Sequence, residues 1–155
     1  MELINANEVY DITLDHMQNP RNYGKLDHPE GVGIGKNPEN GEMVIVYLKI
    51  EDDTIVDIAF QAKACMTTVI AGSIFTDTLK GASIEEAKEL TRIMLSKLDG
   101  LPPEEAACTE LVAEAFYAAL DHLEAKRSDL EAPVPTRMIT QRCDPEAMER
   151  KFTEG

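Results

Sequence analysis

The sequence predicts an α+β domain, with a small three-stranded antiparallel sheet packed by about five helices. Two observations support this prediction. Two β-type runs, residues 43–50 and 55–60, are joined by a short polar turn and form a hairpin. Helical patterns then follow one another, and no helix alternates with strands to build the parallel crossovers of a doubly wound fold.

The N-terminal part contains one short helix and a glycine-rich segment. Residues 6–17 carry apolar side chains at nearly helical spacing, and the pattern stops before Pro20, because proline disfavours helix in the residue before it. An extended stretch with four glycines follows: Gly31, Gly33, Gly35 and Gly41. It lacks the preceding strand and the following helix of a phosphate loop, so we interpret it as a glycine-rich turn or an edge strand.

The second strand of the hairpin indicates which face of the sheet is buried. Val56, Ile58 and Phe60 share one face, and Asp57 and Gln61 fall on the other. This alternation favours a sheet that is covered on one side only, so the helices that follow must supply the cover.

Three helices are expected after the hairpin. The first covers residues 67–79, and the second opens at Ser83 with Glu86 three residues on, which is a capping box. The third covers residues 108–126 and carries a wide apolar stripe. We therefore expect one domain over residues 1–127. Residues 128–155 form a proline-containing linker and tail, with a short helix over 145–152 capped by Asp144.

Composition excludes several classes of partner. The chain has 155 residues and a formal net charge of −14, so nucleic acid and anionic membrane surfaces should be repelled. No apolar run approaches a membrane span and no signal peptide is visible, so we expect a cytoplasmic protein. Three cysteines at uneven spacing do not resemble a secreted disulfide framework. They could be free thiols, metal ligands or sulfur carriers.

Cys65 and Cys108 each stand where a helical pattern begins, and there the helix dipole and free N–H groups stabilise a thiolate. Taken alone, each would more often be a small buried side chain. The loop at residues 38–42 holds no cysteine, and its Asn40 and Gly41 form a turn dipeptide in their own right.

Four short motifs follow one another along the chain: DHMQNPRNYG at residues 15–24, GKNPENGE at 35–42, FQAKAC at 60–65 and LPPEEAAC at 101–108. This series resembles the iron–sulfur cluster assembly scaffolds of the IscU/NifU N-terminal type. The first motif resembles that family's opening "DHYxNPRNxG", and the second resembles its "GxNPxCGD" loop. Residues 60–65 match its "FxxxxC" strand end, and residues 101–108, LPPEEAAC, match "LPPVKxHC" in spacing. The resemblance runs from Val9 to Leu123, and the family's small antiparallel sheet packed by helices agrees with the fold predicted above.

The resemblance implies a scaffold and not an enzyme in the usual sense. Such proteins receive sulfur from a cysteine desulfurase, combine it with iron and pass the cluster to recipient apoproteins. Three cysteines and an aspartate form the family's assembly site, and Cys65 and Cys108 match two of these cysteines. The implied cargo is iron or a labile cluster, with [2Fe–2S] the expected type and zinc an alternative. The implied partner-facing positions are Asn19, Pro20, Arg21, Leu101, Pro102 and Pro103.

The chain departs from the family pattern at the site itself. Asn40 stands where the remaining cysteine should be, and Glu42 replaces the aspartate. An amide oxygen binds iron or zinc much more weakly than a thiolate does, so a stable cluster needs further ligands. These could come from Glu42, from Cys143 in the tail, from a small-molecule thiol or from a second subunit in a homodimer. LPPEE in place of LPPVK also puts in doubt the family's chaperone.

Three functions stay open from the sequence. The first is a scaffold that binds iron or a labile cluster through Cys65 and Cys108. The second is a sulfur-transfer partner that accepts persulfide on Cys108 without building a cluster. The third is a cluster-free paralogue that acts as an interaction protein, which Asn40 favours. Among the histidines, we expect His16 to brace the first helix and its loop, and His122 to be solvated.

Overall fold

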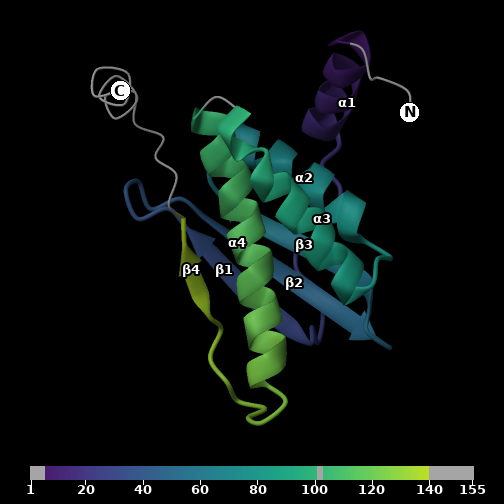
Figure 1. Cartoon of the computed structure of the whole chain (residues 1–155), viewed down its shortest axis with the longest axis vertical. Coiled ribbons are helices and arrows are strands. Elements are labelled where there is room, and N and C mark those ends of the chain that lie inside the picture. The colour runs from purple at the N-terminus through teal and green to yellow at the C-terminus, as the bar shows by residue number, and fades with distance from the viewer. Residues whose placement is uncertain (1–5, 101–102, 140–155) are drawn as a thin grey trace.

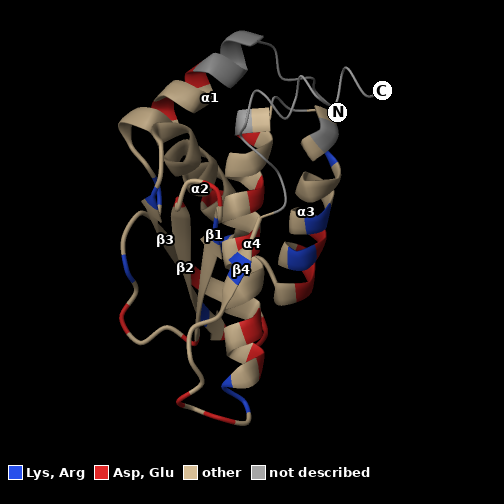
Figure 2. Cartoon of the chain, turned by 90° about the vertical axis from the view of Figure 1, so that its left-hand side faces the viewer, with Lys and Arg blue, Asp and Glu red and all other residues tan. Residues whose placement is uncertain are grey.

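A computed structural model describes residues 6–100 and 103–139. Its strands are β1 (Gly31–Lys36), β2 (Met43–Glu51), β3 (Thr54–Lys63) and β4 (Thr136–Met138). Its helices are α1 (Ala6–Gln18), α2 (Met66–Leu79), α3 (Ile84–Ser96), the 3₁₀ turn η1 (Leu98–Gly100) and α4 (Pro103–Ala125). The helices α2 and α4 lie on one face of the sheet, and α3 packs on the outer side of α4 (Figures 1 and 2). The predicted α+β class is confirmed.

The sheet has four strands and is mixed, so the expected three-stranded antiparallel sheet is wrong by one strand. The order is β3-β2-β1-β4, with β1–β2 and β2–β3 antiparallel and β1–β4 parallel. The fourth strand comes from the segment that was expected to be a linker. A three-residue strand after a proline-containing stretch has no sequence signal of its own and forms by pairing with β1.

Packing therefore continues beyond the expected domain boundary at residue 127. The Ile34 N–H donates to the Pro135 carbonyl at 3.0 Å, and the Ile139 N–H donates to the Lys36 carbonyl at 3.0 Å. The expected helix count also differs, because the part of the chain that is described contains four α-helices and one 3₁₀ turn. The expected fifth helix, over residues 145–152, lies outside the described residues.

The glycines of β1 allow α4 to lie directly on the sheet backbone. A Cβ at Gly33 would stand 2.0 Å from the Ala119 nitrogen, and one at Gly35 would stand 2.3 Å from the Leu111 carbonyl oxygen. The extended interpretation of this stretch is confirmed. The expected position at the edge of the sheet is wrong, because β1 lies between β2 and β4.

The predicted hairpin is confirmed as β2 and β3. Its two central turn residues, Asp52 and Asp53, have φ of 50° and 59°, as the tight hairpin turn that matches strand twist requires. A register shift at Lys49/Ile50 then changes the alternation along β3. Consequently Ile58 and Phe60 are buried as expected, whereas Val56 is 40% exposed.

Helix starts agree with the sequence in three of four cases. The helix α1 begins at Ala6 and α2 begins at Met66. At the start of α3, the Ser83 hydroxyl accepts from the Glu86 N–H at 3.1 Å. The helix α4 begins at Pro103, five residues before the expected start. Proline suits the first position of a helix because its missing N–H would have no partner there.

Acidic side chains are spread over several elements. Figure 2 shows red segments on α1, α3 and α4, with basic residues interspersed on α3. No single acidic block forms among the described residues, which agrees with a solvated acidic surface. In the same part of the chain, no helix is long and apolar enough to cross a bilayer.

Candidate functional site

Three strand ends meet at one end of the sheet, which we call the site end. There Lys63 of β3 pairs with Met43 of β2, and Met43 also pairs with Lys36 of β1. Cys65 follows β3 by two residues, and the loop of residues 37–42 joins β1 to β2. The topology thus places Cys65 and the loop at the same end, and α4 begins near them (Figure 1).

Cys65 is the N-cap residue of α2, as the sequence predicts. Its backbone is extended (φ −72°, ψ 167°), and its carbonyl accepts from the Thr68 N–H at 3.1 Å and from the Val69 N–H at 3.3 Å. The Cys65 side chain is half-buried, and its Sγ lies 3.7 Å from the Thr68 hydroxyl. No acidic side chain occupies the first turn of α2, so the positive end of the helix is left for the sulfur.

The pKa of Cys65 lies below its ordinary value. Partial burial raises the pKa, but hydrogen bonds from the Thr68 N–H, the Thr68 hydroxyl and the Cys108 thiol lower it by more. The charge of Glu42 acts in the opposite direction and raises it. The thiolate, which is the form that binds metals and attacks sulfur, is therefore favoured at Cys65.

Cys108 lies directly beside Cys65. The two Sγ atoms are 3.9 Å apart. The sequence placed Cys108 at a helix start, and this is wrong: it is the sixth residue of α4, 3% exposed, more than a turn beyond the first N–H groups. The helix-dipole argument consequently holds for Cys65 and not for Cys108, because the effect fades within the first turn.

The loop that lacks a cysteine is a hydrogen-bonded turn. The Asn37 N–H donates to the Glu42 carbonyl at 2.8 Å, and the Gly41 N–H donates to the Asn37 carbonyl at 2.9 Å. The Asn40 Oδ1 accepts from the Glu42 N–H at 2.9 Å, and Gly41 has φ of 76°. The Asn40 amide oxygen is thus used to hold the turn, which supports the interpretation of this loop as a tight turn.

Glu42 is half-buried and close enough to Cys65 for its charge to act on the thiol, but it does not complete a ligand set. Within residues 6–100 and 103–139, no three His, Cys, Asp or Glu side chains are grouped so as to hold a metal ion. The paired sulfurs of Cys65 and Cys108 are the preformed part of the site. Cys143 lies outside the described residues.

The expected partner-facing positions fall on two segments. Asn19 and Pro20 are exposed, and half-buried Arg21 forms an ion pair with Asp15. Pro103 is the half-buried first residue of α4, whereas residues 101–102 lie outside the described residues.

His16 braces the first helix, as expected. Its Nδ1 lies 2.6 Å from the buried Ser73 hydroxyl, which also accepts from the Arg21 N–H at 2.7 Å. The DHMQNPRN segment therefore docks α1 and its loop on α2.

Two side chains, those of His122 and Arg137, fix the chain after α4. His122 is 5% exposed, not solvated as expected: its Nδ1 accepts from the Val32 N–H at 3.0 Å, and its Nε2 donates to the Ala132 carbonyl at 2.9 Å. Arg137 of β4 donates to Asp121 at 2.8 Å and stacks 5.4 Å from the Tyr117 ring centre. No local sequence signal identifies these contacts, because each joins segments that become neighbours only in the fold.

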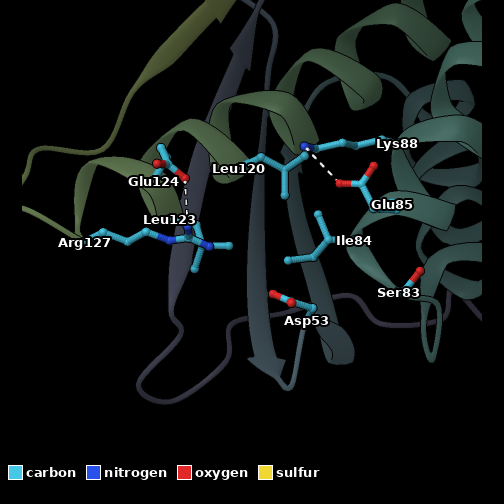
Figure 3. Close-up of a pocket in the computed structure, with 9 residues that line it drawn as sticks. All are labelled: Asp53, Ser83, Ile84, Glu85, Lys88, Leu120, Leu123, Glu124 and Arg127. Atoms are coloured by element: carbon cyan, nitrogen blue, oxygen red, sulfur yellow. Dashed lines mark ion pairs between the residues drawn. The ribbon is translucent and has the colours of Figure 1, made fainter.

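Two pockets differ in their relation to the thiols. A pocket of about 450 Å³ between α1, α2, α3 and α4 is mainly apolar and has Cys108 in its wall. A second pocket, of about 280 Å³, lies between the start of α3 and the end of α4 (Figure 3). Four of its five charged residues form local ion pairs, Lys88 with Glu85 and Arg127 with Glu124. Its described lining contains neither cysteine nor histidine. The first pocket belongs to the thiol site and the second does not.

Comparison with known proteins agrees with this fold. Residues 9–129 match the family described as NifU-like N terminal domain. The iron-sulfur cluster assembly scaffold protein IscU 1 of Archaeoglobus fulgidus is 40% identical over 111 residues, which cover 71% of this chain and 72% of that protein. The iron-sulfur cluster assembly scaffold protein IscU of Aquifex aeolicus is 31% identical over 153 residues, which cover 96% and 98%.

Solved structures show the same fold. A putative iron-sulfur cluster assembly scaffold protein for the SUF system from Fervidobacterium islandicum superposes with a TM-score of 0.64 at 20% identity, covering 75% of this chain and 99% of that one. An N-terminal NifU-like protein from Brucella abortus gives 0.63 at 22% identity, covering 74% and 93%. This chain belongs to the IscU/NifU N-terminal family.

Proposed function

We propose that this protein is a scaffold that holds iron or a labile iron–sulfur cluster through Cys65 and Cys108 and passes it to recipient apoproteins. One observation carries the proposal, namely the 3.9 Å separation of the two sulfurs. Two thiolates on one tetrahedral metal ion, each bound at about 2.3 Å, stand about 3.8 Å apart. The sulfurs are therefore spaced for a single iron, or for zinc in its place.

The chemistry of the remaining ligands supports transient binding. Iron–sulfur clusters take four ligands, usually thiolates, and the described residues supply two. The Glu42 carboxylate is a weaker donor for this cargo than a thiolate, and the Asn40 oxygen is held in its turn. An incompletely ligated cluster, with [2Fe–2S] the simplest type, is one that a recipient protein can remove.

The partners follow from this role. A cysteine desulfurase supplies sulfur, and apoproteins accept the product, as the relatives' names as assembly scaffold proteins suggest. The protein itself acts as a carrier and not as a catalyst. The substitution of LPPEE for LPPVK at residues 101–105 argues against the chaperone that the resemblance implies.

A second candidate is acceptance of persulfide sulfur without cluster assembly. Here a thiolate attacks the outer sulfur of the donor's persulfide, the sulfur–sulfur bond breaks, and its electron pair leaves on the donor thiolate, with no net oxidation. The lowered pKa of half-buried Cys65 favours this thiol over Cys108, which is only 3% exposed. We therefore expect Cys65 to accept the persulfide sulfur, and not Cys108 as the sequence suggested.

Anaerobic reconstitution separates these functions. The full chain is incubated with ferrous and ferric iron and sulfide, and visible absorption and bound iron are measured after desalting. A scaffold gives a chromophore that Cys65→Ser and Cys108→Ser each abolish, while Thr109→Ser, next to Cys108 on α4, leaves it unchanged. Colourless protein that carries persulfide on Cys65 after incubation with a desulfurase selects the second function. If neither forms, the chain is a cluster-free paralogue and the scaffold proposal is wrong.

A further inference from the structure

The sheet has a second face, which points away from α2 and α4. A Cβ at Gly31, Gly33 or Gly35 would meet α4, so the residues between these glycines lie on the opposite face. Strand pairing continues this face across the sheet, because directly opposed residues lie on the same side. We call it the open face. At the site end it carries Ile34, Lys36, Met43, Ile45, Lys63 and Met138.

Exposure on the open face increases toward the site end. The segment between α1 and β1 passes along the outer side of the sheet (Figures 1 and 2), and Tyr47 and Ala59 are only 9% and 5% exposed. Nearer the site end, Ile34 and Ile45 pair with each other and are half-buried. Met138 of β4 is 53% exposed. Apolar side chains of three strands therefore reach solvent in this region.

The apolar character of this region departs from the pattern of a sheet with one solvated face. Such a strand usually alternates apolar residues, which face the core, with polar residues, which face water. From Met43 to Tyr47, however, β2 is apolar or aromatic at every position. An apolar surface that is left accessible commonly marks a site of contact with another molecule. The site end of the open face is therefore a candidate contact surface.

The charge of this region is opposite to that of the whole protein. The chain has a formal net charge of −14, yet the row of paired residues at the site end carries Lys36 and Lys63, one on each side of Met43. The next row along the strands contains no charged side chain. Farther along, Asp57 lies on the same face and forms an ion pair with Lys80 at 3.4 Å. The region therefore suits a partner surface that presents carboxylates and not basic groups.

The dimensions of the region fit a single helix. Lys36 and Lys63 are two strand intervals apart, about 9.6 Å, and a helix with its side chains is about 10–12 Å wide. A helix that lies over Met43 and Ile45 of β2 thus has one lysine on each side. The region is four strands wide, about 14 Å, and two rows deep, about 7 Å. This is far smaller than the roughly 800 Å² that each partner contributes to a standard protein interface.

We propose that the site end of the open face docks an amphipathic helix of a partner protein, with apolar side chains over β2 and carboxylates toward Lys36 and Lys63. A second copy of this chain fits less well, because an isologous contact would bring two basic regions together. The inference goes beyond the proposed function, since the docking needs no metal. It also places the partner near the thiol pair, because Lys63 precedes Cys65 by two residues.

Binding of two synthetic peptides to the full chain tests this proposal without metal. The first is an amphipathic helix of about 18 residues with leucines on one face and glutamates beside them, and the second carries lysines in place of the glutamates. Each peptide is labelled with fluorescein, and its anisotropy is followed as protein is added. The net charge alone favours the lysine peptide. The open face predicts saturable binding of the glutamate peptide, which weakens as salt is added.

Matched variants locate the binding site. Lys36→Gln with Lys63→Gln should weaken binding of the glutamate peptide about tenfold, as the loss of two exposed ion pairs implies. Lys88→Gln with Lys97→Gln, in α3 and at its end, changes the net charge equally and should change the affinity by less than about twofold. Ile45→Thr keeps a strand-forming residue and should also weaken binding about tenfold, because buried apolar area is lost. Carbodiimide coupling of the glutamate peptide to the unaltered chain should give cross-links at Lys36 and Lys63.

Three outcomes would overturn the proposal. Equal weakening by both double variants would show that binding follows the overall charge and not the open face. Absence of saturable binding of the glutamate peptide would show that the open face does not accept an acidic helix. A dimer in sedimentation that Ile45→Thr dissociates would assign the face to a second copy of the chain. None of these results depends on metal binding by Cys65 and Cys108, so the proposed function is tested separately.

Discussion

Replacement of Gly33 by alanine would test whether contact between α4 and the β1 backbone positions the thiol pair. The added Cβ would lie 2.0 Å from the Ala119 nitrogen and 2.4 Å from the Ala118 carbonyl carbon. Ordinary contact begins at 3.4 Å, so helix and strand would have to separate by about 1.4 Å. Both clashing atoms are backbone, and no flexible side chain can move aside.

The energetic cost follows from this geometry. Overpacking a core usually costs about 1–3 kcal/mol, and a clash with helix backbone belongs at or above the upper end. We therefore expect Gly33→Ala to lower the free energy of unfolding by about 3 kcal/mol or more, and Tm by roughly 6–12 °C for a chain of this size. The displacement should also move Cys108 away from Cys65 and weaken metal binding.

Urea unfolding, followed by far-UV circular dichroism, measures the effect. Gly100→Ala is the matched control, because a Cβ there meets nothing within 4 Å and needs no unusual backbone angle. The control should change stability by less than about 1 kcal/mol. If Gly33→Ala proves as stable as Gly100→Ala, the close approach of α4 to β1 is not a determinant of this fold.

Three further substitutions test individual contacts. Thr68→Val removes a hydroxyl that lowers the pKa of Cys65, so the thiolate should form only at higher pH and alkylation by iodoacetamide at pH 7 should slow several-fold; an unchanged rate would contradict this. His122→Phe leaves the Ala132 carbonyl and a strand N–H without partners and should cost about 2–4 kcal/mol in urea unfolding, which an unchanged midpoint would disprove. Arg137→Gln breaks partly exposed ion pairs, so stability should fall by less than about 1 kcal/mol. A larger fall in the midpoint of urea unfolding than that of His122→Phe would contradict this.

Features encoded within a few neighbouring residues could be predicted from the sequence. The capping box at Ser83 and the N-cap position of Cys65 are local, and both are found in the structure. The two-residue turn of the β2–β3 hairpin is also local. In each case the hydrogen bonds join residues that are close in sequence, so a short stretch of sequence contains all the residues that form the feature.

Features that depend on contacts between distant segments could not be predicted. The strand β4 exists because β1 offers it unpaired backbone groups, and its three residues carry no strand pattern. The exposure of Val56 results from a bulge that the alternation does not reveal. His122 looked solvated because its two partners lie 90 residues before it and 10 after it.

The candidate site was partly predicted, through the motif series and not through periodicity. Cys65 and Cys108 are 43 residues apart in sequence, and only the fold shows their sulfurs at 3.9 Å. The position of Cys108 inside α4 was missed because Pro103 starts the helix earlier than the apolar stripe suggests.

Iron K-edge X-ray absorption of the full chain loaded anaerobically with ferrous iron alone tests the central claim, that Cys65 and Cys108 bind one metal ion together. The 3.9 Å sulfur pair predicts sulfur scatterers at about 2.3 Å from the metal, and their number should fall in both Cys65→Ser and Cys108→Ser. A shell of oxygen and nitrogen alone, or a sulfur shell that survives either substitution intact, would contradict the account.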